Sequence, residues 1–240
     1  MELIHADVGL AIHTATGSIP IRHIIGIGRN YADHAKEQAA DLPTRPMIFT
    51  KNFAAAIPQH EAIVIPKACQ DPATGGEQVD FEAELAVVIG PGPARDVPLD
   101  RALDAVLAYT CGNDVSARWW QKEGSGGQFC RGKSFDTFCP LGPRLVSPTE
   151  LGDPQALRVR CRVNGATMQD ASTKDMIFPV AALIAELSRG TTLAPGTVIL
   201  TGTPGGVGMA RKPPVWLKPG DVVEVEIDRI GVLRNSVRAE

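Results

Sequence analysis

Short hydrophobic runs bounded by Gly, Pro or Asp recur along the whole chain. Runs that are rich in Val, Ile, Phe and Thr and end at such residues are typical of strands. They predict strands at residues 21–27, 47–50, 62–65, 81–89, 158–163, 197–201 and 222–227. Apolar positions with helical spacing are fewer, and they predict helices at residues 31–38, 99–108, 116–122 and 179–188.

The order of these segments indicates the fold class. Strands that alternate regularly with helices build a parallel, doubly wound sheet, and this chain lacks that regular alternation. Its 24 glycines and 19 prolines divide it into many short elements instead. We therefore expect a β-rich α+β fold with a mixed or rolled sheet. The 240 residues are enough for one large domain with a core of its own.

Composition and charge limit the partners of this protein. The formal net charge is −3, so no basic field is available to gather phosphates, and we expect no nucleic-acid partner. The five cysteines include no CxxC pair, which favours reduced thiols in the cytoplasm. The first residues do not resemble a signal peptide, and no apolar run is long enough to span a bilayer. We therefore expect a soluble cytoplasmic protein that does not bind membranes.

Two glutamates lie two positions apart in VDFEAELAVVIG, at the start of a predicted strand. Side chains at i and i+2 of a strand share one face, so Glu82 and Glu84 are expected to point the same way, about 7 Å apart. Two carboxylates this close beside apolar residues repel one another, and a divalent cation would relieve the repulsion. The alternative is an exposed sheet edge that carries two ordinary surface glutamates.

Asp114 offers a third carboxylate, just before a predicted short helix. Together with Glu82 and Glu84 it would form an all-oxygen site, which suits Mg²⁺ or Mn²⁺. Ca²⁺ would fit as a substitute, whereas zinc is disfavoured because these segments offer it no His or Cys ligand. Such a site keeps open positions at which a substrate can chelate the cation. The alternative is that Asp114 only caps the N-terminus of the helix.

Two pairs of polar residues share helix faces because their members are three positions apart. His34 and Glu37 would form a base with a carboxylate that orients it, or else a solvated ion pair on an exposed helix. Arg118 and Gln121 would meet an anionic substrate. The alternative for Arg118 is an ion pair with a surface acid, beside the two tryptophans that follow it in the sequence.

Two glycine-containing loops carry the remaining candidates. Lys133 lies in GQFCRGKSFDTFCPLGP, and Thr203 lies in VILTGTPGGVG. The second loop lacks both the GK[ST] ending of a P-loop and the GxGxxG spacing of a dinucleotide site, so we reject both nucleotide motifs. Its backbone amides, beside the Thr203 hydroxyl, would bind a carboxylate, unless the loop is only a tight turn between strands.

Six ordered motifs resemble the fumarylacetoacetate hydrolase family. They extend over residues 24–237, and they are GRNYADHAKEQ, VDFEAELAVVIG, GNDVSARWWQ, GKSFDTFCPLGP, VILTGTPGGVG and RKPPVWLKPGDVVEVEIDRIGVLRNSV. The resemblance implies a mixed β-sandwich roll of the type found in the catalytic domain of that family. It also implies a single catalytic domain over residues 24–240, preceded by a short N-terminal segment over residues 1–23, and assembly as a homodimer.

The same resemblance assigns roles to the candidate residues. It implies that Mg²⁺ or Mn²⁺ is held by three carboxylates, those of Glu82, Glu84 and Asp114. Catalysis would belong to a dyad carried on a lid and to a lysine that faces the substrate, which are His34, Glu37 and Lys133. Three further side chains would bind the substrate, namely Arg118, Gln121 and Thr203.

Chemistry and resemblance together point to a 2-oxo acid substrate, because its carboxylate and carbonyl can chelate a divalent cation. Our leading hypothesis is a metal-dependent hydrolase that cleaves C–C bonds in acylpyruvate or fumarylpyruvate-type substrates. The alternative is an oxaloacetate tautomerase or decarboxylase, or an isomerase or hydratase of 2-oxo diacids, on the same site. A metal-binding protein without turnover is disfavoured, because it would need neither the His34–Glu37 pair nor Lys133.

Overall fold

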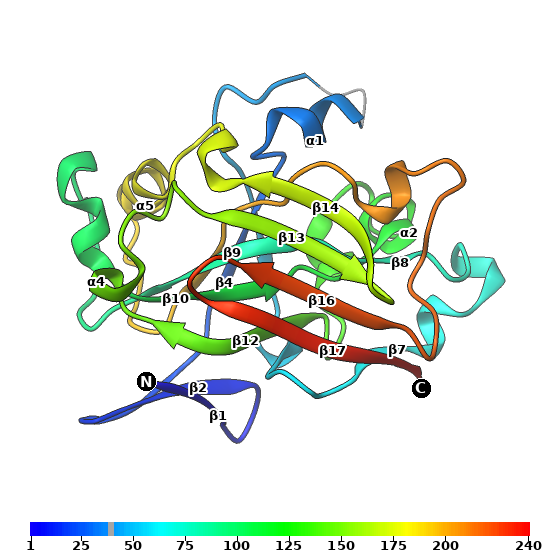
Figure 1. Ribbon diagram of the computed structural model, residues 1–240, viewed down its shortest axis with the longest axis horizontal. Helices are drawn as coiled ribbons and strands as arrows, with labels where there is room; N and C mark the ends of the chain where they lie inside the picture. The colour runs from blue at the N-terminus through cyan, green and yellow to red at the C-terminus, as the bar shows by residue number, and fades with distance from the viewer. Residues whose placement is uncertain (38–40) are drawn as a thin grey trace.

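Two large mixed sheets form the body of the protein (Figure 1). The structure is a computed structural model that describes residues 1–37 and 41–240. The seven-stranded sheet has the order β5 (Met47–Lys51), β4 (Ile24–Gly28), β15 (Val198–Leu200), β9 (Ala83–Ile89), β10 (Val106–Asn113), β12 (Cys139–Val146) and β6 (Ala56–Ile57). The five-stranded sheet has the order β14 (Ala166–Ser172), β13 (Arg158–Val163), β16 (Val222–Ile227), β17 (Gly231–Ala239) and β7 (Ile63–Ile65).

Shorter elements complete the fold. The N-terminal strands form a three-stranded antiparallel sheet, which consists of β1 (Glu2–His5), β2 (Leu10–Thr14) and β3 (Gly17–Pro20). A two-stranded sheet pairs β8 (Val79–Asp80) with β11 (Ser116–Ala117). The α-helices are short, and they are α1 (Ala32–Glu37), α2 (Arg118–Gln121), α3 (Phe129–Lys133), α4 (Pro148–Leu151) and α5 (Val180–Ser188). Within the described ranges, no helix is long and apolar enough to cross a membrane.

The central strand β9 is buried on both of its faces, and all seven of its residues are buried. Because side chains alternate along a strand, Leu85, Val87 and Ile89 join the main hydrophobic cluster, which also contains residues of β13 and β16. Ala86 and Val88 join a second cluster, to which β2 contributes. The site described below lies at the end of β9 that begins with Ala83, so its backbone is held by packing on two sides.

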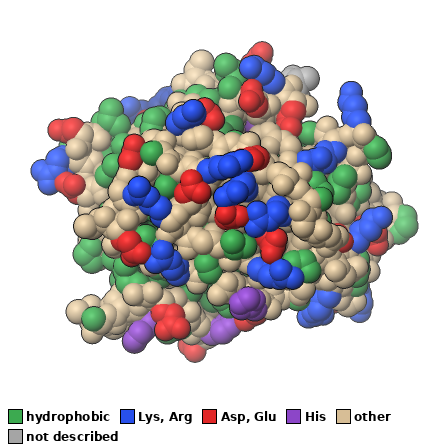
Figure 2. Space-filling model, viewed as in Figure 1, with side chains coloured by type: hydrophobic (Ala, Val, Ile, Leu, Met, Phe, Trp, Pro, Cys, Tyr) green, Lys and Arg blue, Asp and Glu red, His purple; other side chains and the backbone are tan. Residues whose placement is uncertain are grey.

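Paired charges cover the outer face of the five-stranded sheet, where Figure 2 shows basic and acidic side chains interspersed over β13 and β16. Arg162 on β13 lies 2.7 Å from Glu226 and 3.2 Å from Glu224 on β16, and Arg160 lies 2.5 Å from Glu226. Opposite charges on neighbouring strands stabilise a solvated sheet face. This face therefore carries no field of a single sign.

The β-rich fold with mixed sheets is confirmed, and each of the seven predicted strands is present with small shifts at its ends. The predicted helix over residues 99–108 is wrong, because only Leu99–Ala105 is helical, as a 3₁₀ helix, and β10 begins at Val106. Pairing of β10 with both β9 and β12 outweighs the helical pattern of that run. The end of the predicted helix over 31–38 lies outside the described residues. The prediction omitted β1, β2, β3, β6, β8, β10, β11, β12, β14 and β17.

The N-terminal residues pack onto the rest of the chain through β2. Leu10 and Ile12 are fully buried and belong to the second hydrophobic cluster. The boundary between a segment over residues 1–23 and a catalytic domain over residues 24–240 stays a prediction.

Candidate active site

Three carboxylates meet at the start of β9. In the antiparallel pair of β9 and β10, Glu84 lies opposite Gly112. Asp114, which follows β10, therefore comes next to Glu82, which precedes β9, and the Asp114 N–H donates to the Glu82 carbonyl over 2.9 Å. One ligand oxygen from each of Glu82, Glu84 and Asp114 lies within 4.8 Å of the others. The strand register thus brings all three predicted ligands together.

All three carboxylates are buried, and this finding excludes two alternatives that the sequence left open. Glu82 and Glu84 are 5% and 1% exposed, so the interpretation as an exposed sheet edge is wrong. Asp114 does not cap α2, since the N-cap residue there is Ala117 and makes no side-chain cap. The carboxylate of Asp114 instead points at two lysines.

Buried cations hold two of the three carboxylates. Lys133 Nζ donates to Glu82 Oε2 over 2.7 Å and to Asp114 Oδ2 over 2.5 Å. Lys51 Nζ donates to Asp114 Oδ1 over 2.5 Å. Glu84 is different, because among the described residues it has no cation within ion-pair distance, and its Oε2 accepts the Gly202 N–H over 2.6 Å. Glu84 is therefore the carboxylate whose charge is least compensated by the protein.

The pKa values of the two glutamates move in opposite directions for this reason. Burial disfavours the ionised form of Glu82, but the charges of Lys133 and Arg118 outweigh it and lower the pKa of Glu82 to about 2. Burial, together with the neighbouring carboxylates of Asp114 and Glu82, raises the pKa of Glu84 well above its usual value. A cation beside Glu84 would remove this penalty, so the buried all-oxygen donor set fits a hard divalent metal.

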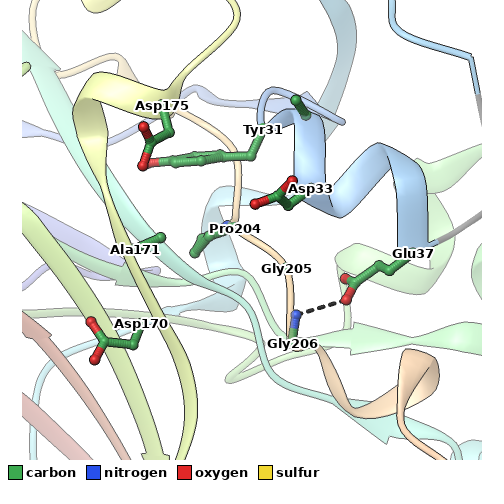
Figure 3. A pocket seen from close by; sticks show the side chains of 10 residues that line it. Tyr31, Asp33, Glu37, Asp170, Ala171, Asp175, Pro204, Gly205 and Gly206 are labelled. Atoms are coloured by element: carbon green, nitrogen blue, oxygen red, sulfur yellow. Dashed lines mark hydrogen bonds between the residues drawn. The ribbon is translucent and has the colours of Figure 1, made fainter.

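The His34–Glu37 pair is only half buried, because His34 is buried whereas Glu37 is exposed and its side chain keeps 21% of its accessible surface. His34 is 4% exposed, and its Nδ1 lies 2.7 Å from Glu37 Oε1. A carboxylate oxygen accepts hydrogen bonds, so Nδ1 of His34 is the donor in this pair. Glu37 Oε2 also accepts the Gly206 N–H over 2.8 Å, and Figure 3 shows this bond from α1 to the loop after β15.

The predicted substrate-binding residues form hydrogen bonds within the protein. Arg118 Nε donates to Asp80 Oδ2 over 2.8 Å, and its Nη1 lies 2.7 Å from Glu82 Oε1. The same Nη1 donates to Gln121 Oε1 over 2.9 Å. The Thr203 hydroxyl donates to a backbone carbonyl and accepts from a glutamine amide. These contacts pair Arg118 with two carboxylates and hold the side chains of Gln121 and Thr203 in place.

The loop 202–209 binds carboxylates of the protein itself. Its backbone amides at Gly202 and Gly206 donate to Glu84 and Glu37, as described above. The Gly208 N–H donates to Asp80 Oδ1 over 2.7 Å. The loop therefore connects the three carboxylates, the dyad and the ion pair of Arg118. That these amides also bind a carboxylate of a ligand stays a prediction.

A small hollow of about 20 Å³ joins these groups. Six of the nine predicted site residues line it, and they are His34, Glu82, Arg118, Gln121, Lys133 and Thr203. A larger cavity of about 470 Å³ lies nearby, between α1, β14 and the loop at Pro204 (Figure 3). It is lined by Tyr31 and by four acidic side chains, of which only Glu37 belongs to the dyad. The chemistry therefore centres on the small hollow.

The family model for the C-terminal part of fumarylacetoacetate hydrolase matches residues 23–238. The chain belongs to the fumarylacetoacetate hydrolase family. Among its relatives, oxaloacetate tautomerase fahd2, mitochondrial, from Xenopus laevis is 49% identical and covers 89% of this chain. The 2,4-didehydro-3-deoxy-L-rhamnonate hydrolase of Sphingomonas sp. is 46% identical and covers 90% of this chain. The resemblance read from the six motifs is confirmed.

One solved structure of the family is similar to this chain over almost the whole length of both proteins. It is the fumarylpyruvate hydrolase from Pseudomonas aeruginosa in complex with Mn²⁺ and pyruvate, with a TM-score of 0.83, 29% sequence identity and 99% coverage of each chain. The present chain spans 65% of the Xenopus laevis tautomerase and 73% of the Sphingomonas hydrolase. Members of this fumarylacetoacetate hydrolase family are thus enzymes of more than one reaction type.

Two residues of the site were absent from the sequence-based prediction. Asp80 precedes Glu82 by two positions, so the strand alternation that identified the glutamates also includes it. Lys51 ends β5, and its partner Asp114 is 63 positions away. No local pattern marks Lys51, because only the packing of β5 and β4 against the rest of the sheet brings it to the site.

Proposed function

We propose that this chain is a divalent-metal-dependent oxaloacetate tautomerase, which interconverts the enol and keto forms of its substrate. The observation that carries the proposal is the buried carboxylate triad of Glu82, Glu84 and Asp114. Its member Glu82 lines the same small hollow as the buried base His34. Relatives named oxaloacetate tautomerases are 44–49% identical to this chain, which supports the tautomerase over the hydrolase that the sequence first favoured. The chain spans only about two thirds of those proteins.

Glu82, Glu84 and Asp114 would hold the metal. Mg²⁺ and Mn²⁺ both suit carboxylate ligands, and the Mn²⁺ complex of the Pseudomonas aeruginosa hydrolase supports a cation of this kind. When bound, such a cation supplies Lewis-acid polarisation of a 2-oxo group. Lys133, which lies between Glu82 and Asp114, places a further positive charge where the substrate oxygen would develop negative charge.

His34 would transfer the proton that tautomerisation requires. In the direction from keto to enol, a proton leaves C3 of the 2-oxo acid and a proton reaches the C2 oxygen. Glu37 accepts from Nδ1 of His34 and so fixes the orientation of the ring, and Gly206 in turn fixes Glu37. The reverse step returns the proton to C3, so no net charge or atom is lost.

A second candidate is hydrolytic C–C cleavage of an acylpyruvate or fumarylpyruvate. The similarity to the fumarylpyruvate hydrolase favours it, because that similarity covers 99% of both chains. In this reaction His34 would deprotonate a water that attacks the distal carbonyl, and the bond to the pyruvate carbon would break. The two reactions differ in products, since only hydrolysis releases pyruvate.

The test is to supply the purified chain with Mg²⁺ or Mn²⁺ and to follow two substrates in parallel. We expect the enol absorbance of oxaloacetate to decay much faster than in buffer with the metal alone. Pyruvate release from acetylpyruvate and fumarylpyruvate is measured with a coupled dehydrogenase. Rapid pyruvate release without accelerated ketonisation would refute the proposed tautomerase activity and support the hydrolase activity.

The remaining proposals concern assembly and location. We propose a homodimer, as the family resemblance implies, and light scattering on the purified chain tests it. The cytoplasmic location also stays a prediction, and the mitochondrial tautomerases among the relatives argue for testing it by cell fractionation.

A further inference from the structure

Three cations line the small hollow, and one of them is not neutralised. Arg118 contacts Asp80 and Glu82, and Lys133 contacts Glu82 and Asp114. Arg29 has no carboxylate within ion-pair distance in the part of the chain that the structure describes, and its Nε is buried without a hydrogen-bond partner. A buried guanidinium nitrogen without a partner is unfavourable unless a ligand supplies an acceptor.

The backbone of Arg29 is held in an unfavourable conformation. Its φ of 55° lies in the left-handed region, which favours glycine, asparagine and aspartate. The next residue, Asn30, is fully buried and anchored, because its Nδ2 donates to the carbonyls of Phe178 and Thr201 and its Oδ1 accepts the Phe178 N–H. Strain that the surroundings impose in this way is typical of residues with a functional side chain.

Three apolar side chains share the wall of the hollow with the charged and polar groups. They are Ile27, Phe49 and Phe129. Apolar walls exclude water, and a charge-assisted hydrogen bond is stronger where water is excluded. A guanidinium also presents two parallel N–H donors, whose geometry matches a carboxylate.

We propose that Arg29 binds the distal carboxylate of a dicarboxylic 2-oxo acid and thereby selects oxaloacetate over monocarboxylic 2-oxo acids. The inference rests on the proposed function, because it places the 2-oxo carboxylate at the triad. Arg118 and Lys133 are already paired there, so the second carboxylate requires another cation, and Arg29 is the one available.

The chain position of Arg29 links this contact to the chemistry. Arg29 precedes α1, the helix that carries His34. In oxaloacetate, C3 lies between the 2-oxo carbon and the distal carboxylate. A ligand that is bound both at the three carboxylates and by Arg29 therefore has its C3 held between these two contacts. The segment that carries Arg29 also carries the base His34.

The test compares oxaloacetate with 2-oxobutyrate, in which a methyl group replaces the distal carboxylate. Calorimetry with the Mg²⁺-loaded chain measures the affinity for each, with freshly dissolved oxaloacetate. We expect Arg29→Gln to weaken oxaloacetate binding about 10- to 100-fold, as expected for a charge-assisted bond, and to change 2-oxobutyrate binding less than about twofold. Arg29→Lys keeps the charge and is expected to restore part of the affinity.

Arg22→Gln is the matched control, because Arg22 is exposed and the substitution removes the same charge. It should leave both affinities unchanged, and Mg²⁺ affinity should be equal in all variants. Equal weakening for both ligands, or no weakening for either, overturns the assignment of Arg29. A wild-type chain that binds oxaloacetate through Arg29 but does not accelerate its ketonisation refutes the tautomerase and leaves the assignment of Arg29 in place.

Discussion

Glu84→Gln should stabilise the metal-free protein, although it removes a predicted metal ligand. One oxygen of Glu84 lies within 4.8 Å of an oxygen of Glu82 and of Asp114. At an effective dielectric constant of about 20, each repulsion at that distance costs roughly 3 kcal/mol when Glu84 is ionised. Attraction to Lys133 offsets about one of the two, so at a pH where Glu84 is ionised, neutralising residue 84 should add up to roughly 3 kcal/mol to the free energy of unfolding. Gln can still accept the Gly202 N–H.

Thermal unfolding in EDTA, followed by circular dichroism, measures this effect. For a domain of this size, about 1 kcal/mol corresponds to about 2–4 °C in Tm, so the expected increase is about 6–12 °C. The matched control is Glu82→Gln, which breaks ion pairs with Lys133 and Arg118 and should destabilise the metal-free chain by about 3–5 kcal/mol. Saturating Mn²⁺ should raise the Tm of the wild type and leave that of Glu84→Gln unchanged.

The pH dependence of stability tests independently whether Glu84→Gln stabilises the metal-free chain. Because the pKa of Glu84 is raised in the folded state, the folded chain keeps a proton that the unfolded chain loses above its ordinary pKa of about 4.3. In EDTA, the contribution of Glu84 to the free energy of unfolding of the wild type therefore decreases as the pH rises from the pKa of Glu84 in the unfolded chain toward its pKa in the folded chain. The advantage of Glu84→Gln should grow over the same range and vanish at lower pH. Destabilisation by both variants at every pH would refute the reasoning.

Two further predictions concern the dyad. His34→Ala should lower kcat by about 10²–10⁴-fold, the usual contribution of general acid–base catalysis, with Mg²⁺ affinity unchanged by calorimetry. Glu37→Gln cannot accept well from both His34 and the Gly206 N–H, so it should lower kcat by about tenfold and increase hydrogen exchange at the Gly206 amide. Loss of Mg²⁺ binding in His34→Ala, or unchanged exchange in Glu37→Gln, would contradict these roles.

The grouping of Glu82 and Glu84 could be predicted from the sequence because it follows from one local rule. Alternation along a strand puts positions two apart on one face, and the structure keeps both side chains together although β9 itself begins at Ala83. The pair of His34 and Glu37 follows from the equally local spacing of a helix. Such short-range rules do not depend on how distant segments pack.

The contacts that long-range packing creates could not be predicted in this way. Lys51 reaches Asp114 only because β5 and β10 belong to the same sheet, with three strands between them. The run over residues 99–108 has helical spacing, but from Val106 on it belongs to β10, because β9 and β12 pair with that strand on both sides. Burial of the carboxylates depends on the same pairing, so local patterns left the exposed-edge alternative open.

The charges around the site give a last prediction about the ligand. Four buried carboxylates face three buried cations, and they are Asp80, Glu82, Glu84 and Asp114 with Lys51, Arg118 and Lys133. With all four carboxylates ionised, as they would be around a bound divalent cation, these groups sum to −1, and the cation together with Arg29 brings the site to +2, which matches the charge of −2 on ionised oxaloacetate. Binding of an anion makes the site less positive and raises the pKa values of nearby groups, so the dianion oxaloacetate should take up a larger fraction of a proton than 2-oxobutyrate. Calorimetry in two buffers of different ionisation enthalpy measures this fraction, and equal proton uptake with both acids would show that the site does not respond to the second carboxylate.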